Sequence, residues 1–184
     1  MRKERVEVRA EKLEAQGWPE VFRKAPVSVL WATWFGSGFL PFVPGTWGSL
    51  AALPVALGLQ AWLGLAGLLG LALVAMLAGI PAGTRVAELS GTHDPSHVVI
   101  DEVAGQAFAL VGVYAFAPAA RTTSATTILV AAAFVLFRLF DIVKPGPIRK
   151  LERLPGGLGI MADDVASGLV VALLLGAARL VLRW

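Results

Sequence analysis

Long stretches without a charged side chain set the pattern of this sequence. One covers residues 50–82, one covers residues 125–137, and one covers residues 165–182, in which Arg179 is the one charged residue. A membrane-spanning helix needs about 20 mainly apolar residues, and about 17 at the least. The first stretch is too long for one span and long enough for two short ones, with a turn near Gln60 and Gly64. We therefore predict spans at residues 47–60, 64–82, 98–117, 125–143 and 164–182.

The first 40 residues differ from the rest. Residues 1–24 mix acidic and basic side chains, with apolar residues at helical spacing, which predicts a short solvated helix. Residues 27–40 are apolar and rich in tryptophan and glycine, but they are too few to span, so we expect an interfacial or re-entrant helix. The predicted organisation is a basic cytoplasmic N-terminal segment, residues 1–26, and a membrane-embedded domain, residues 27–184.

Composition indicates a membrane protein. Hydrophobic residues make up 57% of the chain and charged residues 16%, whereas soluble domains average about 45–50% and about 25%. Basic residues gather near the N-terminus and at residues 149–153 and do not interleave with aromatic residues, which fits the positive-inside rule and argues against nucleic-acid binding. The absence of cysteine excludes disulfides and thiolate metal sites. We expect an all-α polytopic membrane bundle with four or five spans.

Residues 41–50 form a distinct motif, P-F-V-P-G-T-W-G-S-L. Pro44, Gly45 and Gly48 predict a tight turn, and Thr46 and Ser49 are candidate N-cap residues for the helix that follows. A glycine-rich turn at the start of a helix also presents free backbone N–H groups, which favour a phosphate. From this motif alone, a plain helix cap is the preferred interpretation.

The direction of successive spans brings the polar segments together. Because spans alternate in direction, the starts of the first, third and fifth share a membrane face with the ends of the second and fourth. That face collects five acids: Asp101, Glu102, Asp141, Asp163 and Asp164. It also carries Arg138, Lys144 and the clustered basic residues, so we expect it to be cytoplasmic. Ionisable residues at the edge of a span usually face a partner, water or an ion.

These side chains favour a hard cation and a phosphate. Carboxylates without cysteine and with few histidines prefer magnesium to zinc, and Arg138 and Lys144 are anion binders. Together they suit phosphoryl transfer or phosphate-ester hydrolysis. The alternative is a network of ion pairs that holds the spans together, in which Arg138 pairs with Asp141. Lys144 would then pair with Asp163 or Asp164. Both arrangements can hold at once. The five acids outnumber these two bases, which argues weakly for a bound cation.

The chain resembles the phosphatidylglycerophosphatase A family in four motifs: G-S-G-F-L-P-F-V-P-G-T-W-G-S-L (36–50), H-D-P-S-H-V-V-I-D-E-V-A-G (93–105), F-R-L-F-D-I-V-K-P-G-P-I (137–148) and G-G-L-G-I-M-A-D-D-V-A-S-G (156–168). The resemblance implies a magnesium-dependent enzyme of the bacterial inner membrane. It would remove the terminal phosphate of phosphatidylglycerophosphate, which leaves phosphatidylglycerol. The site residues implied are Asp101, Glu102, Asp141, Asp163 and Asp164 for catalysis and the metal, with Thr46, Arg138 and Lys144 around the phosphate.

Two positions depart from the family pattern. Gly146 stands where tryptophan is expected, and Ser167 stands where alanine is expected, but neither position is charged. Other hypotheses are a different lipid-phosphate phosphatase or phosphotransferase, and a non-enzymatic small transporter or membrane subunit. A transporter typically carries charges near the bilayer midplane and an internal repeat, whereas these charges lie at predicted span ends. Oligomeric state, and the choice between an aspartate nucleophile and water, stay open at this point. His93 and His97 are weak ligand candidates.

Overall fold

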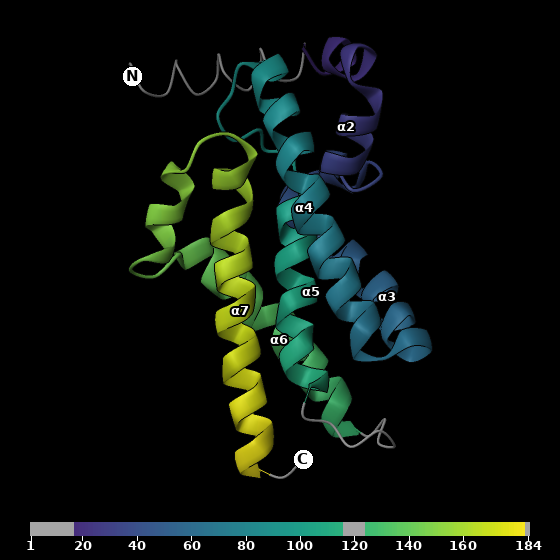
Figure 1. Ribbon diagram of the computed structural model, residues 1–184, viewed down its shortest axis with the longest axis vertical. Helices are drawn as coiled ribbons and strands as arrows, with labels where there is room; N and C mark the ends of the chain where they lie inside the picture. Colours follow the sequence, from purple (N-terminus) through teal and green to yellow (C-terminus); the bar gives the residue numbers. More distant parts are fainter. Residues whose placement is uncertain (1–16, 116–123, 183–184) are drawn as a thin grey trace.

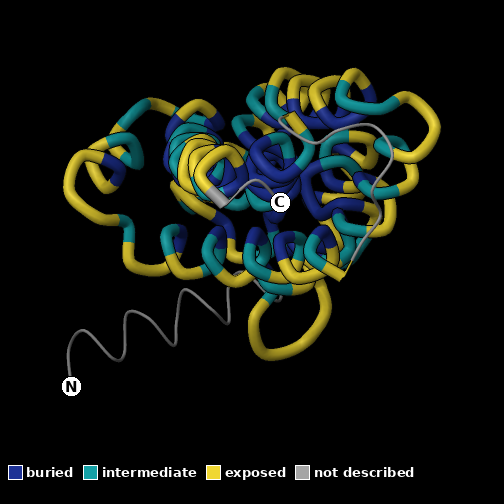
Figure 2. The backbone as a smooth tube through the Cα atoms, turned by 90° about the horizontal axis from the view of Figure 1, so that it is seen from below, coloured by how far each residue is buried: buried dark blue, intermediate teal, exposed yellow. Residues whose placement is uncertain are grey.

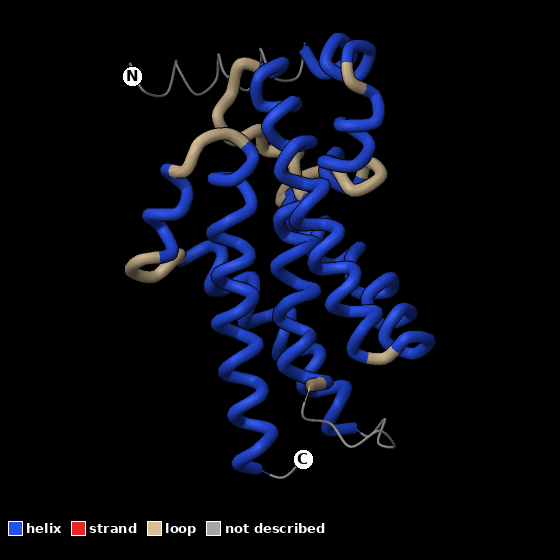
Figure 3. The backbone as a smooth tube through the Cα atoms, viewed as in Figure 1, coloured by secondary structure: helices blue, strands red, loops and turns tan. Residues whose placement is uncertain are grey.

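A computed structural model describes residues 17–115 and 124–182, and that part of the chain is helical with no strand (Figure 1, Figure 3). A helical segment at residues 17–24 leads into α2 (Pro26–Ala32) and the 3₁₀ helix η1 (Ser37–Phe39). The long helices that follow are α3 (Pro44–Leu63), α4 (Leu65–Ser90), α5 (Ile100–Tyr114), α6 (Ser124–Val143) and α7 (Gly157–Leu182). A second 3₁₀ helix, η2 (Ile148–Arg153), precedes α7.

Helix α5 lies at the centre of the bundle, and α3, α4, α6 and α7 pack around it. Residues 103–110 of α5 are all buried. Figure 2 shows this buried interior, surrounded by helices whose outer sides are exposed. Successive long helices run in opposite directions (Figure 1), as the predicted alternation of spans requires.

Among the described residues, α4, α6 and α7 are long and apolar enough to cross a membrane. Their outer sides carry exposed apolar side chains such as Leu77, Val135 and Leu173, which suit contact with lipid. The single charge in residues 165–182, Arg179, is buried and donates a hydrogen bond to the backbone carbonyl of Val113 near the end of α5. The predicted fold class, a polytopic α-helical membrane bundle, is confirmed, and α3 and α5 bring the bundle to the predicted four or five long helices.

The predicted boundaries agree with the helices at one turn and differ from them at the start of the last helix. The turn between α3 and α4 falls at Gly64, as predicted, and Gly64 has a φ of +61°. However, α7 begins at Gly157, before the predicted start at residue 164. Asp163 and Asp164 therefore lie about 10 Å along the helix, at about 1.5 Å per residue, and not at its first turn. The loop predicted at residues 118–124 lies almost wholly outside the described residues.

The N-cap prediction for Thr46 and Ser49 is wrong. Helix α3 begins at Pro44 with Val43 at the N-cap position and no side-chain cap. Proline suits the first helical position because it lacks the N–H that would go unpaired there and its φ is already helical. The predicted tight turn is thus the first turns of α3. The Ser49 hydroxyl points back along the helix and donates to the carbonyl oxygen of Gly45 at 3.0 Å.

The segment at residues 27–40 is too short to span, as predicted. It forms the seven-residue helix α2, a turn and η1. Trp31, Trp34 and Phe35 contact one another edge to face or tilted, and the Phe35 side chain is exposed. Its interfacial or re-entrant position, and the division of the chain after residue 26, stay predictions. The predicted N-terminal helix is confirmed only at residues 17–24, because residues 1–16 lie outside the described part.

Candidate active site

A cavity of about 570 Å³ opens where the predicted polar segments meet. Its lining comes from the loop after α4, the first turn of α5, the end of α6, η2 and the first turns of α7. The charged residues and histidine of that lining are His93, Asp94, Asp101, Glu102, Asp141, Lys144, Glu152, Arg153, Asp163 and Asp164. All five acids that the alternation of spans placed on one face therefore line a single cavity.

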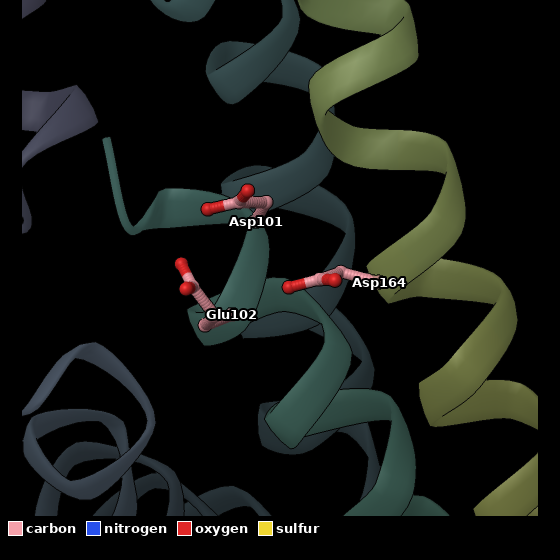
Figure 4. A group of neighbouring side chains, drawn as sticks. All are labelled: Asp101, Glu102 and Asp164. Carbon is pink, nitrogen blue, oxygen red and sulfur yellow. The ribbon is translucent and has the colours of Figure 1, made fainter. Parts of the chain in front are cut away.

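Asp101, Glu102 and Asp164 form a compact group, here called the inner carboxylates (Figure 4). One oxygen of each lies within 4.8 Å of the others. Asp101 Oδ1, Glu102 Oε2 and Asp164 Oδ2 are buried and have no hydrogen-bond partner among the described residues. Burying a charged oxygen without a partner is costly. A cation bound by these three oxygens would remove that cost.

The close packing of α5 on α7 fixes the separation of the inner carboxylates. Asp101 and Glu102 lie in the first turn of α5, and Asp164 lies in α7. A Cβ atom at Gly168 would lie 2.2 Å from the backbone oxygen of Gly105, so only a glycine fits there. The small residues let the two helix backbones approach closely enough for carboxylates from both helices to meet.

Arg138 stands behind the carboxylates and is not among the residues that line the cavity. Its guanidinium Nη1 lies 2.7 Å from Asp141 Oδ2 and 3.7 Å from Glu102 Oε1. The start of α3 closes this side, since a Cβ atom at Gly45 would lie 1.8 Å from Glu102 Oε1. The Arg138–Asp141 pair of the predicted ion-pair network is therefore present, and Arg138 orients two acids.

Lys144 follows the last residue of α6 and lines the cavity. Its ammonium group pairs with Asp163 and with Glu152, the latter at 2.8 Å. Burial opposes the charge on Lys144, but the hydrogen bonds and charges of Asp163 and Glu152 outweigh it, so the pKa of Lys144 is raised. Its φ of +44° lies in the left-handed region, and non-glycine residues held there by their surroundings gather at functional sites. The pair predicted between Lys144 and Asp163 is present.

The five predicted metal ligands thus fall into two classes. Asp101, Glu102 and Asp164 lie close enough to bind one ion, although Glu102 also lies 3.7 Å from Arg138. Asp141 and Asp163 lie outside this group, and each pairs with a basic side chain. The ion-pair interpretation of the sequence therefore holds for Asp141 and Asp163, and the other three acids have the proximity that a metal site requires. The metal and catalytic roles of all five acids stay predictions.

The remaining predicted residues lie further out. Thr46 is half-buried in the first turns of α3 and does not line the cavity, and its phosphate-binding role stays a prediction. His93 lines the cavity, but His97 has a structural place: its Nδ1 lies 3.0 Å from the carbonyl oxygen of Gly38, and its ring contacts Trp18.

Sequence reasoning missed three charged lining residues, Asp94, Glu152 and Arg153. The sequence offered little reason to place them in the site, because charged residues in loops are usually solvated. Asp94 directly follows His93 within a recognised motif, and Glu152 and Arg153 belong to the basic cluster before α7. The 3₁₀ helix η2 packs on α7, and this contact brings Glu152 and Arg153 to the cavity.

Comparisons with known proteins identify the family to which the chain belongs. The phosphatidylglycerophosphatase A family matches residues 30–179. A protein of Bacteroides thetaiotaomicron named "Putative phosphatidylinositol-3-phosphatase" is 40% identical, over 87% of this chain and 98% of its own. The phosphatidylglycerophosphatase A proteins of Haemophilus influenzae and Escherichia coli K12 are each 38% identical, over 84% and 78% of this chain and 89% and 78% of theirs. No solved structure matches. The chain belongs to the phosphatidylglycerophosphatase A family, as its motifs predicted.

Proposed function

We propose that this cavity hydrolyses the terminal phosphate of phosphatidylglycerophosphate, with magnesium bound by Asp101, Glu102 and Asp164. The products are phosphatidylglycerol and inorganic phosphate. One observation carries the proposal: three carboxylates from two helices meet within 4.8 Å, and each has a buried oxygen without a partner among the described residues. Like charges so close together repel one another unless a cation balances them.

The family assignment makes the chain a phosphatase, associated with a membrane and acting on a phospholipid. The family and two relatives name phosphatidylglycerophosphate as substrate, and one relative names a phosphatidylinositol 3-phosphate. In both lipids a phosphate monoester sits on a polyol that a phosphodiester joins to diacylglycerol. Phosphatidylinositol 3-phosphate is therefore the second candidate substrate for the same cavity.

The inner carboxylates fit magnesium by their chemistry. Magnesium is a hard cation that takes oxygen ligands, commonly one or two protein carboxylates together with waters and substrate phosphates. When bound, it would stabilise the negative charge that develops on the phosphoryl oxygens during hydrolysis. The wide cavity beside these carboxylates leaves room for the phosphate itself.

The other polar residues hold and orient this group. Arg138 binds Glu102 and Asp141 and so limits the orientations that Glu102 can take. Lys144 presents a charged ammonium group to the cavity, where it can attract a phosphate oxygen. Burial of the inner lining keeps bulk water away, and charge interactions are stronger in such an environment.

We also propose that the cavity faces the cytoplasm from a bacterial inner membrane, because basic residues gather on its side. The chain has no native cysteine, so single cysteines at His93 and Arg153 can be probed with an impermeant thiol reagent. Both residues are exposed at the cavity. We expect labelling in inside-out vesicles and protection in intact cells. Labelling of either position from outside intact cells would contradict the orientation. Thr123, the natural far-side control, lies outside the described residues.

The activity test is phosphate release by the purified protein in detergent micelles. We expect magnesium-dependent turnover of phosphatidylglycerophosphate, loss of turnover with a chelator, and recovery when magnesium is added back. Soluble glycerol phosphate should be a poor substrate, because it lacks the acyl chains that keep the lipid at the membrane. Faster release from phosphatidylinositol 3-phosphate would favour the second candidate, and no release from either lipid would contradict the proposal.

A further inference from the structure

The lining of the cavity changes from buried to exposed. Asp101, Asp141, Asp163 and Asp164 are buried at its inner end. His93, Asp94 and Arg153 are exposed and, with Glu152, form what we call the mouth. A ligand that fills the cavity therefore meets the inner carboxylates at one end and the mouth residues at the other.

The basic residues of the site differ in whether their charge is already balanced. Lys144 pairs with Glu152 and Asp163, and Arg138 lies outside the lining, bound to two further acids. Arg153 also lines the cavity, but its side chain forms no ion pair or hydrogen bond with the described residues. Its guanidinium is thus the cation of the lining whose charge no described carboxylate pairs with, and it is free to bind an anionic ligand.

Arg153 has a defined position although it is exposed. It is the last residue of η2, which packs on α7, and Ile148 at the start of η2 is buried. Arg149 and Lys150 lie on the same 3₁₀ helix and are also exposed, but they do not line the cavity. Of these three neighbouring basic residues, only Arg153 lines the cavity.

We infer that Arg153 binds the second phosphate of the substrate, the phosphodiester that joins the headgroup to diacylglycerol, and so determines specificity. This inference rests on the proposed function. A phosphate monoester at the inner carboxylates leaves the phosphodiester one glycerol unit away, toward the mouth. A guanidinium suits it, because its planar N–H groups donate two parallel hydrogen bonds to phosphate oxygens. The same contact would serve any lipid that carries a monoester beyond a phosphodiester.

The test compares Arg153→Ala with the matched control Arg149→Ala, which removes the same charge from the same 3₁₀ helix. Arg153→Lys keeps the positive charge but loses the planar pair of N–H donors of the guanidinium. Each protein is assayed in neutral-detergent micelles for kcat and KM on phosphatidylglycerophosphate. Inhibition by phosphatidylglycerol is measured in the same assay, because that product keeps only the second phosphate. Equilibrium binding of phosphatidylglycerol by calorimetry gives a readout without turnover.

For Arg153→Ala we expect KM and the phosphatidylglycerol inhibition constant to rise together, by about 10- to 100-fold, the loss typical of one charged hydrogen-bonding contact. The value of kcat should change little, and Arg153→Lys should fall between wild type and Arg153→Ala. Equal effects of Arg149→Ala would show only a general attraction of the anionic lipid and would overturn the inference. So would a fall in kcat with unchanged KM and unchanged phosphatidylglycerol binding.

The inference and the proposed function fail in different ways. If wild type releases no phosphate from phosphatidylglycerophosphate, the proposed function is wrong, whatever Arg153 binds. Calorimetry would then still report whether phosphatidylglycerol binding depends on Arg153. If wild type turns over the lipid while phosphatidylglycerol binds equally well to wild type and Arg153→Ala, the function stands and the phosphodiester site is wrong.

Discussion

Two neighbouring aspartates on α7 have opposite surroundings. Asp163 pairs with Lys144, whose ammonium group also binds Glu152. Asp164 instead faces Asp101 and Glu102. Each aspartate also has one buried oxygen without a hydrogen-bond partner among the described residues, Asp163 Oδ1 and Asp164 Oδ2. The two side chains are one residue apart, so they project from the helix about 100° apart. One carboxylate therefore completes an ion pair, and the other extends a cluster of like charges.

The difference indicates that the cavity separates two tasks. Lys144 pairs with both Asp163 and Glu152, so this group can hold η2 and the end of α6 against α7. Among the inner carboxylates, Glu102 shares Arg138 with Asp141 at the longer distance of 3.7 Å, and Asp101 and Asp164 form no ion pair with a described base. The cluster therefore suits a cation that arrives with the substrate or before it. The substitutions below test this separation, beginning with the largest expected effect.

Asp164→Asn should have the largest effect on activity. It keeps the shape of the side chain and removes one of the three charges that would bind magnesium. We expect turnover of phosphatidylglycerophosphate to fall by about 100-fold or more, since even loss of a residue that only supports a metal ligand commonly costs about 10- to 100-fold. The thermal stability of the magnesium-free protein should stay the same or rise, because repulsion among the inner carboxylates falls. A stability loss with preserved turnover would contradict a metal role.

Gly45→Ala should follow. The added Cβ atom would lie 1.8 Å from Glu102 Oε1, so the Glu102 carboxylate has to move. A displacement of about 1 Å near reacting groups can cost about 100-fold in rate. We expect a smaller loss than for Asp164→Asn, because the end of the Glu102 side chain can rotate. Gly58→Ala is the matched control: it lies on the same helix and a Cβ atom there has nothing within 4 Å. Equal kcat for Gly45→Ala and wild type would show that the position of Glu102 is not critical.

Arg138→Lys should cost about tenfold in turnover. Lysine keeps the positive charge, but its side chain is one bond shorter, so its ammonium group cannot lie where Arg138 Nη1 contacts both Asp141 and Glu102. The loss of one hydrogen bond to a charged group is worth about 1.5–3 kcal/mol, or roughly tenfold or more. Lys144→Arg is the comparison and should lose less, because it keeps both the charge and the donors for Glu152 and Asp163. The reverse order of the two variants would contradict these roles.

Asp163→Asn should have the smallest effect on turnover and a measurable effect on stability. It leaves Lys144 with Glu152 as its carboxylate partner. Loss of one partner of a buried ion pair costs about 3–5 kcal/mol, and we expect about 1–3 kcal/mol here because Glu152 remains and Lys144 is partly exposed. Thermal unfolding in detergent at constant pH measures the loss. If unfolding is unchanged while turnover falls as far as in Asp164→Asn, both aspartates act as metal ligands.

The sequence predicted the bundle well because spans leave a strong signal. Stretches without charge marked the long helices, and the alternation of span directions brought the five acids to one cavity. The division among those acids was not predictable, since it depends on the rotation of each residue about its helix. The boundary of α7 was predicted too late, because Gly157, Leu158 and Gly159 read as loop residues although they form its first turn.

Residues outside the long helices were the hardest to predict. Arg153 reaches the cavity because η2 folds back on α7, a tertiary contact that local sequence does not encode. Thr46 and Ser49 resembled cap residues, but Pro44 starts α3 two residues earlier than Thr46. The polar residues in the sequence thus predicted which segments meet at the site. The ion pairs and contacts within the site depend on how the helices pack, and the sequence does not show that.

Binding of Mn²⁺, a paramagnetic substitute for magnesium, tests the central claim most directly, because it reports the metal site without turnover. Free and bound Mn²⁺ would be distinguished by electron paramagnetic resonance for wild type, Asp164→Asn and Asp163→Asn, all purified in the same detergent. The account predicts a tight Mn²⁺ site in wild type that magnesium displaces, that is lost in Asp164→Asn and that is retained in Asp163→Asn. Retention of tight binding in Asp164→Asn, or no tight binding in wild type, would contradict it.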